Sequence, residues 1–415
     1  MHPRPHQPGF TRWLSQATLW LLLLALAGTG CRTSARRLVS DPAPAVSRLA
    51  AGGSIRAETD ALVQPLLVNG EISGLAVGVV MPDGSTQSFF YGQTGQAGNH
   101  NPPDADSLFQ IGSLSKLFTE TLLVQLIDEG RLHWEDTVRE CLPTNIVVSA
   151  EAGRLTLYEL ATHTAGLPRE PMTLTQLGSL LRYFVTGHNL YGHLTVAYLQ
   201  SYLRHNHPRP QAPPEFVYSN LGAGLLAYLI EQKTGTPTTA LIEEKICRPL
   251  GMTNSTFALT EAQQLRLTVG HAGQHACWKR HSATLPAWDM GDLLTPVAGM
   301  YSSLNDLLRF ARANLGQTHP AVAAALRQTQ VVQIKTERGG EALGWIVSPL
   351  AAPPRTFTFK DGMVSGYCAF IGIDPKTQVA VVVLSNTFNW DEKVGCNLLV
   401  RLVEASGKGA PLHSD

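Results

Sequence analysis

Net charge is the first property that this sequence lacks. Its 415 residues include 32 lysines and arginines against 32 aspartates and glutamates, and only 15% of the residues are charged. Proteins that bind a polyanion such as nucleic acid usually carry a basic excess, so the balance gives no support to that class of partner. Hydrophobic residues make up 44% of the chain, enough to bury a substantial core. We expect a globular protein whose substrate must be inferred from a site.

The chain is also poor in cysteine. After the N-terminal segment it has five widely scattered cysteines: Cys141, Cys247, Cys277, Cys368 and Cys396. This odd and scattered set indicates no disulfide framework, and none of the five lies beside a histidine and an acid as a cysteine nucleophile would. We expect at least one of them to be a buried thiol.

The N-terminal apolar run is too short for a permanent transmembrane helix. Residues 19–27, "LWLLLLALA", cover about half of the roughly 20 residues that a membrane span needs. They follow a stretch containing Arg4 and Arg12 and precede small residues and Cys31, the pattern of a secretory signal. Cleavage after Ala27 and lipidation of Cys31 in a lipoprotein box both remain open. We expect an exported, periplasmic or cell-envelope protein, tethered to the membrane if Cys31 is lipidated.

Composition divides the chain into four parts. Residues 1–31 form the predicted signal segment, and residues 32–54, rich in proline, alanine, glycine and serine, have the character of a tether. A single folded domain is predicted over residues 55–408, followed by a short tail over 409–415.

Strand patterns lie at both ends of this domain. Residues 74–92, "GLAVGVVMPDGSTQSFFYG", predict a β-hairpin, and "TFTFKDG", "GYCAFIGIDP" and "QVAVVVLSN" predict three strands before a C-terminal amphipathic helix. The middle is mainly helical and has no internal repeat. We therefore predict an α+β fold: an antiparallel sheet of five or more strands flanked by N- and C-terminal helices, with a large helical insertion. Residues 55–115 and 341–408 would form the α/β lobe and residues 116–340 the helical lobe, with the site between them.

Ser113 and Lys116 lie at the start of an apolar helix, "LFTETLLVQLIDE", which stops at Gly130. On a helix that begins near Ser113, both side chains lie on one face, so the lysine can reach the serine hydroxyl. The N–H groups of a helix start would stabilise negative charge on an acyl oxygen. Burial in an apolar helix would lower the proton affinity of Lys116 and suit it to act as a base. The alternative is an N-cap serine followed by a solvated lysine.

Two further motifs could act together with Ser113 and Lys116. Tyr218 and Asn220 precede another helix, where they could be a core tyrosine and a helix cap; near two ammonium groups, however, the tyrosine would be acidified and could take and return a proton. Lys360 and Gly362, in "FKDGMVSGY", follow a predicted strand and by themselves indicate only a turn.

Taken together, Ser-x-x-Lys, Tyr-x-Asn and Lys-Asp-Gly resemble the active-site set of the serine β-lactamase and penicillin-binding protein superfamily, and Tyr-x-Asn is similar to its class C branch. The segments "LATHTAGLPRE", "ICRPLGMTNSTF" and "GMYSSLNDLLRFARANL" extend the resemblance over almost all of residues 74–407. The first of them and "LVEASGKGAP" look most like AmpH-type penicillin-binding proteins. This resemblance implies a D-alanyl-D-alanine carboxypeptidase/endopeptidase that acts on peptidoglycan without a cofactor or metal.

The resemblance also implies a role for each residue. Ser113 would be the acylated nucleophile, Lys116 its activator, and Tyr218 the general base and then acid. Asn220 would orient the substrate amide. Lys360 would keep Tyr218 acidic and help to hold the substrate.

The predicted strand in "TFTFKDG" and the residues after it would supply the rest of the site. The backbone N–H groups of Ser113 and Met363 would form the oxyanion hole, with Asp361 and Gly362 beside the substrate. The family usually has threonine or serine where this chain has Asp361, and a carboxylate there would repel an acidic substrate. Because that repulsion would act on the acid of D-alanine and on the acid of a β-lactam, a carboxylesterase of the same fold, or an amidase for uncharged ends, is an alternative. A β-lactamase also stays open. A non-catalytic binding protein is the least favoured, because the five motif side chains are all retained.

Other polar groups receive no catalytic role. His271, His275, Cys277 and His281 could in principle gather zinc, but the segment has no CxxC or HExxH pattern, so no metal site is predicted. His163 has no acid near it, which favours a structural hydrogen bond at a helix end. Ser303 and Asp306 have the pattern of a capping box.

Overall fold

The computed structural model describes residues 47–49, 52–171, 173–186, 189–273, 283–317, 320–336, 339–350, 356–388 and 393–407. The predicted signal segment with Cys31, most of the predicted tether over residues 32–54 and the predicted tail over 409–415 lie outside these ranges. Within the ranges, no helix combines the length and the apolar character needed to cross a membrane. Ser47–Asp415 form one unit by their contacts.

An eight-stranded antiparallel sheet organises this unit, in the order β2-β1-β11-β10-β9-β8-β7-β6. Its strands are β1 (Gly74–Val80), β2 (Thr86–Gly92), β6 (Ile334–Thr336), β7 (Gly339–Glu341), β8 (Ile346–Pro349), β9 (Thr356–Val364), β10 (Tyr367–Asp374) and β11 (Val379–Ser385). The hairpin β1–β2 pairs with the C-terminal strand β11, so the two ends of the domain build one sheet. This confirms the predicted α+β fold.

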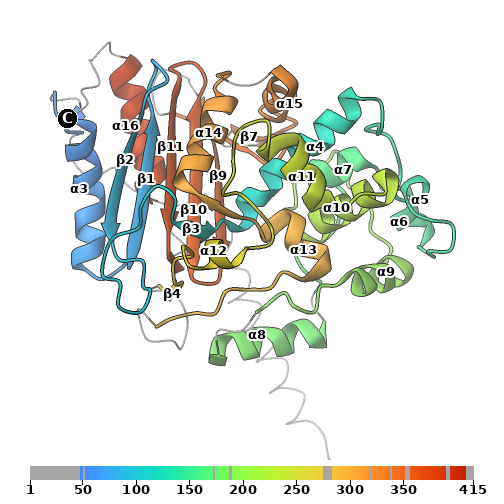
Figure 1. Cartoon of the computed structure of the whole chain (residues 1–415). Helices are drawn as coiled ribbons and strands as arrows, with labels where there is room; N and C mark the ends of the chain where they lie inside the picture. Colours follow the sequence, from blue (N-terminus) through green and yellow to red (C-terminus); the bar gives the residue numbers. More distant parts are fainter. Residues whose placement is uncertain are drawn as a thin grey trace, which may run out of the picture. The chain divides into compact units, whose positions relative to one another are not determined.

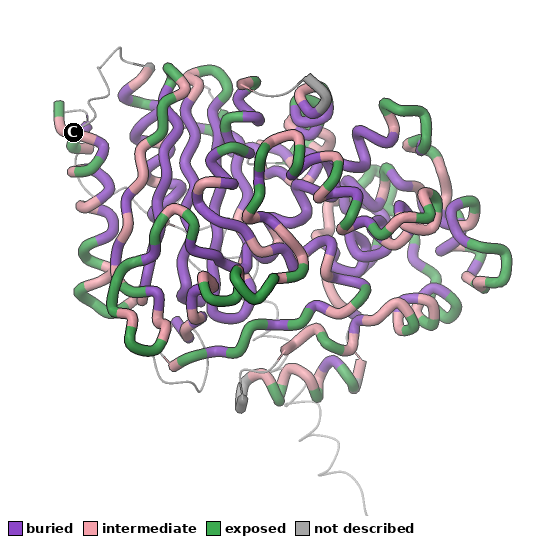
Figure 2. The backbone as a smooth tube through the Cα atoms, viewed as in Figure 1, coloured by how far each residue is buried: buried purple, intermediate pink, exposed green. Residues whose placement is uncertain are grey.

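Helices cover both faces of the sheet (Figure 1). Helices α3 (Ile55–Val68) and α16 (Lys393–Gly407) pack on one face, and α14 (Leu304–Asn314) packs on the other. Every residue of β1, β10 and β11 is buried as a result, which explains their continuous apolar sequences (Figure 2).

The helical part contains the remaining helices. They are α4 (Ser115–Asp128), α5 (Val138–Cys141), α6 (Ala150–Arg154), α7 (Leu157–Ala161), α8 (Leu174–Thr186), α9 (Val196–His205), α10 (Asn220–Thr234), α11 (Thr238–Ile242), the π-helical turn η3 (Glu243–Cys247), α12 (Glu261–Gln264), α13 (Gly291–Ala298) and α15 (Pro320–Thr329). Two small sheets pair β3 (Leu108–Gln110) with β5 (Tyr301–Ser303) and β4 (His271–Ala272) with β12 (Thr387–Phe388). Helix α4 is buried on nearly every side, as its sequence indicated, and packs against α10, α13 and α15.

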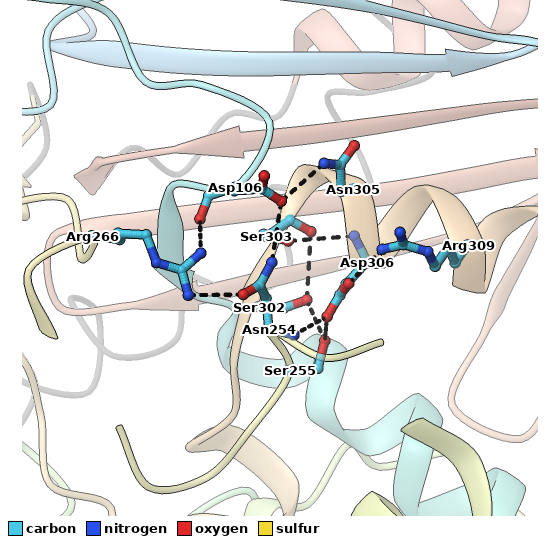
Figure 3. A network of polar contacts seen from close by, with 9 residues as sticks. All are labelled: Asp106, Asn254, Ser255, Arg266, Ser302, Ser303, Asn305, Asp306 and Arg309. Atoms are coloured by element: carbon cyan, nitrogen blue, oxygen red, sulfur yellow. Dashed lines mark hydrogen bonds and ion pairs between the residues drawn. The ribbon is translucent and has the colours of Figure 1, made fainter. Parts of the chain in front are cut away.

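A buried carboxylate joins distant segments beside α14 (Figure 3). Ser303 caps α14 by accepting the N–H of Asp306 at 3.3 Å. Instead of returning a bond to Ser303, the fully buried Asp306 carboxylate accepts from Asn254 N, Ser255 Oγ and Arg309 Nη1 at 2.7, 2.9 and 2.8 Å. The predicted capping box is thus half formed, and its acid ties the 246–257 segment to the 299–315 segment.

Two features differ from the sequence prediction. Strand β9 continues through Asp361 and Gly362 to Val364, so these residues form no turn; the chain reverses at Ser365 and Gly366. The sheet also takes β6 and most of β7 from residues before position 341. These two strands are short and partly exposed, so their sequences lack the apolar alternation by which strands are recognised.

Candidate active site

Ser113 lies where the helical part meets the sheet. It is half-buried in a single 3₁₀ turn, η2 (Gly112–Leu114), which leads directly into α4 and packs against β9 and β10. The hydroxyl of Ser115 donates to the carbonyl of Gly112 at 2.7 Å and fixes the turn.

Two glycines allow the turn to approach β9 this closely. Gly112 has φ +54°, and a Cβ there would lie 2.9 Å from the backbone nitrogen of Met363. A Cβ at Gly362 would overlap the carbonyl oxygen of Ile111. The backbone of Met363 therefore lies against the residue that precedes Ser113, and Gly362 is required by packing rather than by a turn.

Lys116 is 1% exposed and is held by three acceptors. Its Nζ donates to Ser113 Oγ at 3.2 Å, to Asn220 Oδ1 at 3.0 Å and to the carbonyl oxygen of Val297 at 3.2 Å. Burial lowers the pKa of Lys116, and the nearby cations Lys360 and Arg169 act in the same direction. The predicted burial and reach of this lysine are both present.

Tyr218 completes the contacts of the serine hydroxyl. Its phenol oxygen lies 2.9 Å from Ser113 Oγ. Around its ring centroid are Lys360 Nζ at 4.8 Å, Arg169 Cζ at 5.1 Å and Lys116 Nζ at 5.2 Å. Burial raises the pKa of Tyr218, but the three positive charges outweigh it and lower the pKa from 10.0 to about 8.

Asn220 starts α10, where Ser219 caps the helix by accepting Gly222 N at 2.8 Å. The side-chain amide of Asn220 is held at both ends, because its Oδ1 accepts from Lys116 and its Nδ2 donates to Glu170 Oε1 at 2.7 Å. Glu170 also lies 3.4 Å from the Nε of Arg169. The orientation of the amide is therefore set by one cation and one carboxylate.

Lys360 and Asp361 lie on opposite faces of β9, because side chains alternate along a strand. Lys360 is 6% exposed and pairs with Ile371 of the core. Asp361 is half-buried and pairs with Phe370, whose ring lies against Gly395 of α16. The lysine therefore shares the face of the sheet on which η2 packs, and the aspartate does not.

The structure brings together all the predicted catalytic side chains: Ser113, Lys116, Tyr218, Asn220 and Lys360. It adds Arg169 and Glu170, which lie in the quoted "LATHTAGLPRE" segment but had been given no role. It also brings Glu120 close to these lysines, a glutamate one helical turn after Lys116 in a mostly apolar helix, which was a signal available in the sequence.

The described residues give no support to a zinc site at the histidines and cysteine of the 271–281 segment. His271 lies in β4, whereas His275, Cys277 and His281 lie outside the described residues. In the described ranges, no three histidine, cysteine, aspartate or glutamate side chains are arranged to hold a metal ion.

This arrangement suits acyl transfer by a serine nucleophile. A hydroxyl in contact with both an acidified phenol and a buried lysine whose pKa is lowered can lose its proton as it attacks a carbonyl carbon. The adjacent backbone of η2 and β9 supplies N–H groups of the kind that stabilise an acyl oxyanion.

Comparisons with known proteins agree with this chemistry. The β-lactamase family profile matches residues 59–405. The D-alanyl-D-alanine-carboxypeptidase/endopeptidase AmpH of Escherichia coli strain K12 is 31% identical over 332 residues, which cover 75% of this chain and 79% of that protein. A β-lactamase of Pseudomonas fluorescens is 26% identical over 372 residues, covering 80% and 93% of the two chains. The solved class C β-lactamase from Rhodobacter sphaeroides shares the fold, with a TM-score of 0.69, 24% identity, and coverage of 83% of this chain and 98% of that one.

Proposed function

The chain belongs to the β-lactamase family and is a serine hydrolase of the β-lactamase and D-alanyl-D-alanine carboxypeptidase kind, and from this premise we propose that it is a D-alanyl-D-alanine carboxypeptidase/endopeptidase of peptidoglycan. The observation that carries the proposal is the contact of Ser113 Oγ with both Lys116 Nζ and the Tyr218 phenol, at 3.2 and 2.9 Å. The likeness to AmpH over three quarters of the chain supports the substrate class.

In the proposed reaction, Ser113 Oγ attacks the carbonyl carbon between two D-alanines and its proton passes to Tyr218. The N–H groups of Ser113 and Met363 would hold the oxyanion, where one such donor is typically worth roughly 3 kcal/mol. The C–N bond then breaks as Tyr218 returns the proton to the leaving amine. Water then attacks the resulting ester while Tyr218 takes its proton. The bond between the acyl carbon and Ser113 Oγ breaks, and Tyr218 returns that proton to Oγ, which restores the hydroxyl.

The other residues would tune and orient this sequence. Lys116 and Lys360, with Arg169, keep the phenol acidic at neutral pH. Asn220, held between Lys116 and Glu170, would align the amide of the substrate. No step requires a cofactor.

We further propose that the protein is exported and tethered to the membrane of the cell envelope through lipidated Cys31. The support is the sequence of residues 1–31 alone. Metabolic labelling with a palmitate analogue should mark the full-length protein and fail on Cys31→Ala; labelling that survives this change would remove the tether from the proposal.

Covalent labelling by a fluorescent penicillin tests the site. We expect the purified protein to be labelled and Ser113→Ala to take no label, while Ser85→Ala, in the exposed β1–β2 turn, is labelled like wild type. Muropeptide analysis should then show release of the terminal D-alanine. Labelling that persists in Ser113→Ala would refute the assignment of the nucleophile.

A β-lactamase is the second candidate, because the relative from Pseudomonas fluorescens carries that name over 93% of its length. The two activities differ in how fast water releases the acyl group. Rapid turnover of nitrocefin without action on muropeptides would select the β-lactamase. Hydrolysis of p-nitrophenyl acetate without penicillin labelling would instead select an esterase.

A further inference from the structure

His163 adopts a backbone conformation that most residues avoid. Its φ is +56°, in the left-handed region, and it lies two residues after α7 with only 7% of its surface exposed. A non-glycine residue in that region is held there by its surroundings and often belongs to a functional site. The contacts of His163 show what holds it.

Two hydrogen bonds join His163 to the residues on either side of Tyr218. Its carbonyl oxygen accepts the N–H of Val217 at 2.9 Å, and its Nδ1 accepts the N–H of Ser219 at 3.3 Å. Its ring centroid also lies 4.8 Å from that of Tyr218. One residue therefore contacts the backbone before the phenol, the backbone after it and the phenol ring itself.

This arrangement requires a neutral imidazole. Nδ1 can accept a hydrogen bond only when it carries no proton, so the single ring proton is on Nε2. Burial lowers the pKa of His163 well below 6.5, and the charges of Lys360, Lys116 and Arg169 act in the same direction. The ring therefore keeps its acceptor and adds no fourth positive charge beside the phenol.

We propose that His163 is a positioning residue for Tyr218: its carbonyl and its neutral Nδ1 fix both neighbouring peptide units, so that the phenol oxygen stays in contact with Ser113 Oγ and beside the three cations. This inference rests on the proposed function, in which Tyr218 takes the proton of Ser113. It assigns His163 no contact with substrate.

Two substitutions at His163 test the loss of the Nδ1 acceptor without disturbing the backbone conformation. Asparagine and glycine both tolerate a positive φ, and both remove the ring, but only asparagine offers an oxygen near the position of Nδ1. His163→Asn and His163→Gly are therefore a matched pair. Thermal melting of both establishes that each is folded at the assay temperature.

The rate of penicillin labelling is the first measurement. We expect His163→Asn to stay within about threefold of wild type and His163→Gly to fall at least about tenfold, because small misplacements of a reacting group can cost up to 100-fold. Equal rates in the two variants would overturn the proposal.

The second measurement is the ionisation of Tyr218, read from tyrosinate absorbance as the difference between each protein and the same protein carrying Tyr218→Phe. We expect the apparent pKa to stay near 8 in His163→Asn and to rise toward 10 in His163→Gly, as the phenol moves away from the cations. An unchanged value in His163→Gly would overturn the proposal. This titration needs no turnover, so a wild-type protein that takes no penicillin would refute the proposed function while leaving the positioning role measurable.

Discussion

Two buried polar clusters of this protein differ in how completely their charges are satisfied. Around Asp306, one carboxylate accepts from a backbone N–H, a serine hydroxyl and an arginine, and every donor comes from a segment that the acid joins (Figure 3). Around Tyr218, by contrast, three cations crowd one phenol. Burial raises the pKa of Asp306 despite these donors, so both clusters hold a shifted pKa. The comparison teaches that the donors of the satisfied cluster join segments of the fold, whereas like charges in proximity acidify a phenol that contacts a reactive serine.

Glu120 makes the contrast sharper. It lies one turn after Lys116 in α4, is 2% exposed, and its Oε2 has no hydrogen-bond partner within the described residues. Burial raises its pKa to about 8, although the charges of Lys116 and Lys360 oppose the shift. A buried carboxyl that has two lysines nearby and yet stays protonated at neutral pH lowers the stability of this region.

The largest expected effect comes from breaking the active-site cluster at its centre. Tyr218→Phe removes the proton acceptor of Ser113, and positioned acid–base groups typically contribute about 10²–10⁴ in rate, so we expect penicillin labelling to slow by that factor. The wild-type rate should rise with pH and level off above about 8, where the phenol has lost its proton. The measurement is the labelling rate of both proteins from pH 5 to 10; a loss smaller than threefold would show that another group takes the proton.

How much of this site the sequence could predict depends on whether a signal was local. Ser113 with Lys116, the β1–β2 hairpin and the three C-terminal strands follow from patterns within a few residues of one another, and these predictions of structure are confirmed. The bond between Asn220 and Glu170 joins residues 50 positions apart. The third acceptor of Lys116 is a backbone carbonyl, whose position does not depend on the identity of Val297. Such contacts are set by tertiary packing, which local patterns do not encode.

The second prediction breaks the satisfied cluster. Asp306→Ala leaves the N–H of Asn254 without its acceptor and the hydroxyl of Ser255 with Ser302 Oγ alone, so we expect the free energy of unfolding to fall by about 2–4 kcal/mol. The labelling rate of the folded protein should not change, because this cluster has no part in the chemistry. Urea denaturation measures the first and penicillin labelling the second.

Arg309→Ala is the matched control for that cluster. Its side chain is 46% exposed, so its pair with Asp306 should contribute no more than about 1 kcal/mol. A loss of stability from Arg309→Ala as large as that from Asp306→Ala would mean that the ion pair, rather than the satisfied acceptor, stabilises the cluster.

The third prediction concerns Glu120→Gln, which keeps the shape of the side chain and removes its ionisation. The carboxyl loses its proton near pH 4.5 in the unfolded chain and near 8 in the folded one. Between these values the folded state holds more protons, so this group makes wild-type stability fall as the pH rises. The variant should match wild type at pH 4 and be more stable by roughly 2 kcal/mol at pH 6 and roughly 4 kcal/mol at pH 8.

Urea denaturation of both proteins at pH 4, 6 and 8 measures this difference. Labelling at pH 7 should stay within about threefold of wild type, because both side chains are then neutral. A variant that is less stable than wild type at pH 8 would show that Glu120 is ionised and held by the lysines, which would make the two clusters alike.

The smallest expected effect is that of Asp361→Thr. The sequence alone suggested that this carboxylate would repel an acidic substrate, but strand alternation places it on the face opposite Lys360, opposite Phe370 in the neighbouring strand. Its side chain makes no hydrogen bond or ion pair within the described residues. Burial raises the pKa of Glu341 to about 7, and the negative charge of Asp361 acts in the same direction. We therefore expect Asp361→Thr to change labelling and D-alanine release by less than about threefold, and stability by less than about 0.5 kcal/mol.

The neighbouring lysine supplies the control for this last prediction. Lys360→Gln alters the opposite face of the same strand and removes one of the three cations around the phenol, so the pH at which labelling levels off should move up toward 10. If Asp361→Thr instead raised D-alanine release about tenfold while Lys360→Gln left the pH profile unchanged, the outward residue of β9 would be the one that meets the substrate. Strand β9 would then have to twist at Asp361 when substrate binds, and charge repulsion would again explain a restricted choice of substrate.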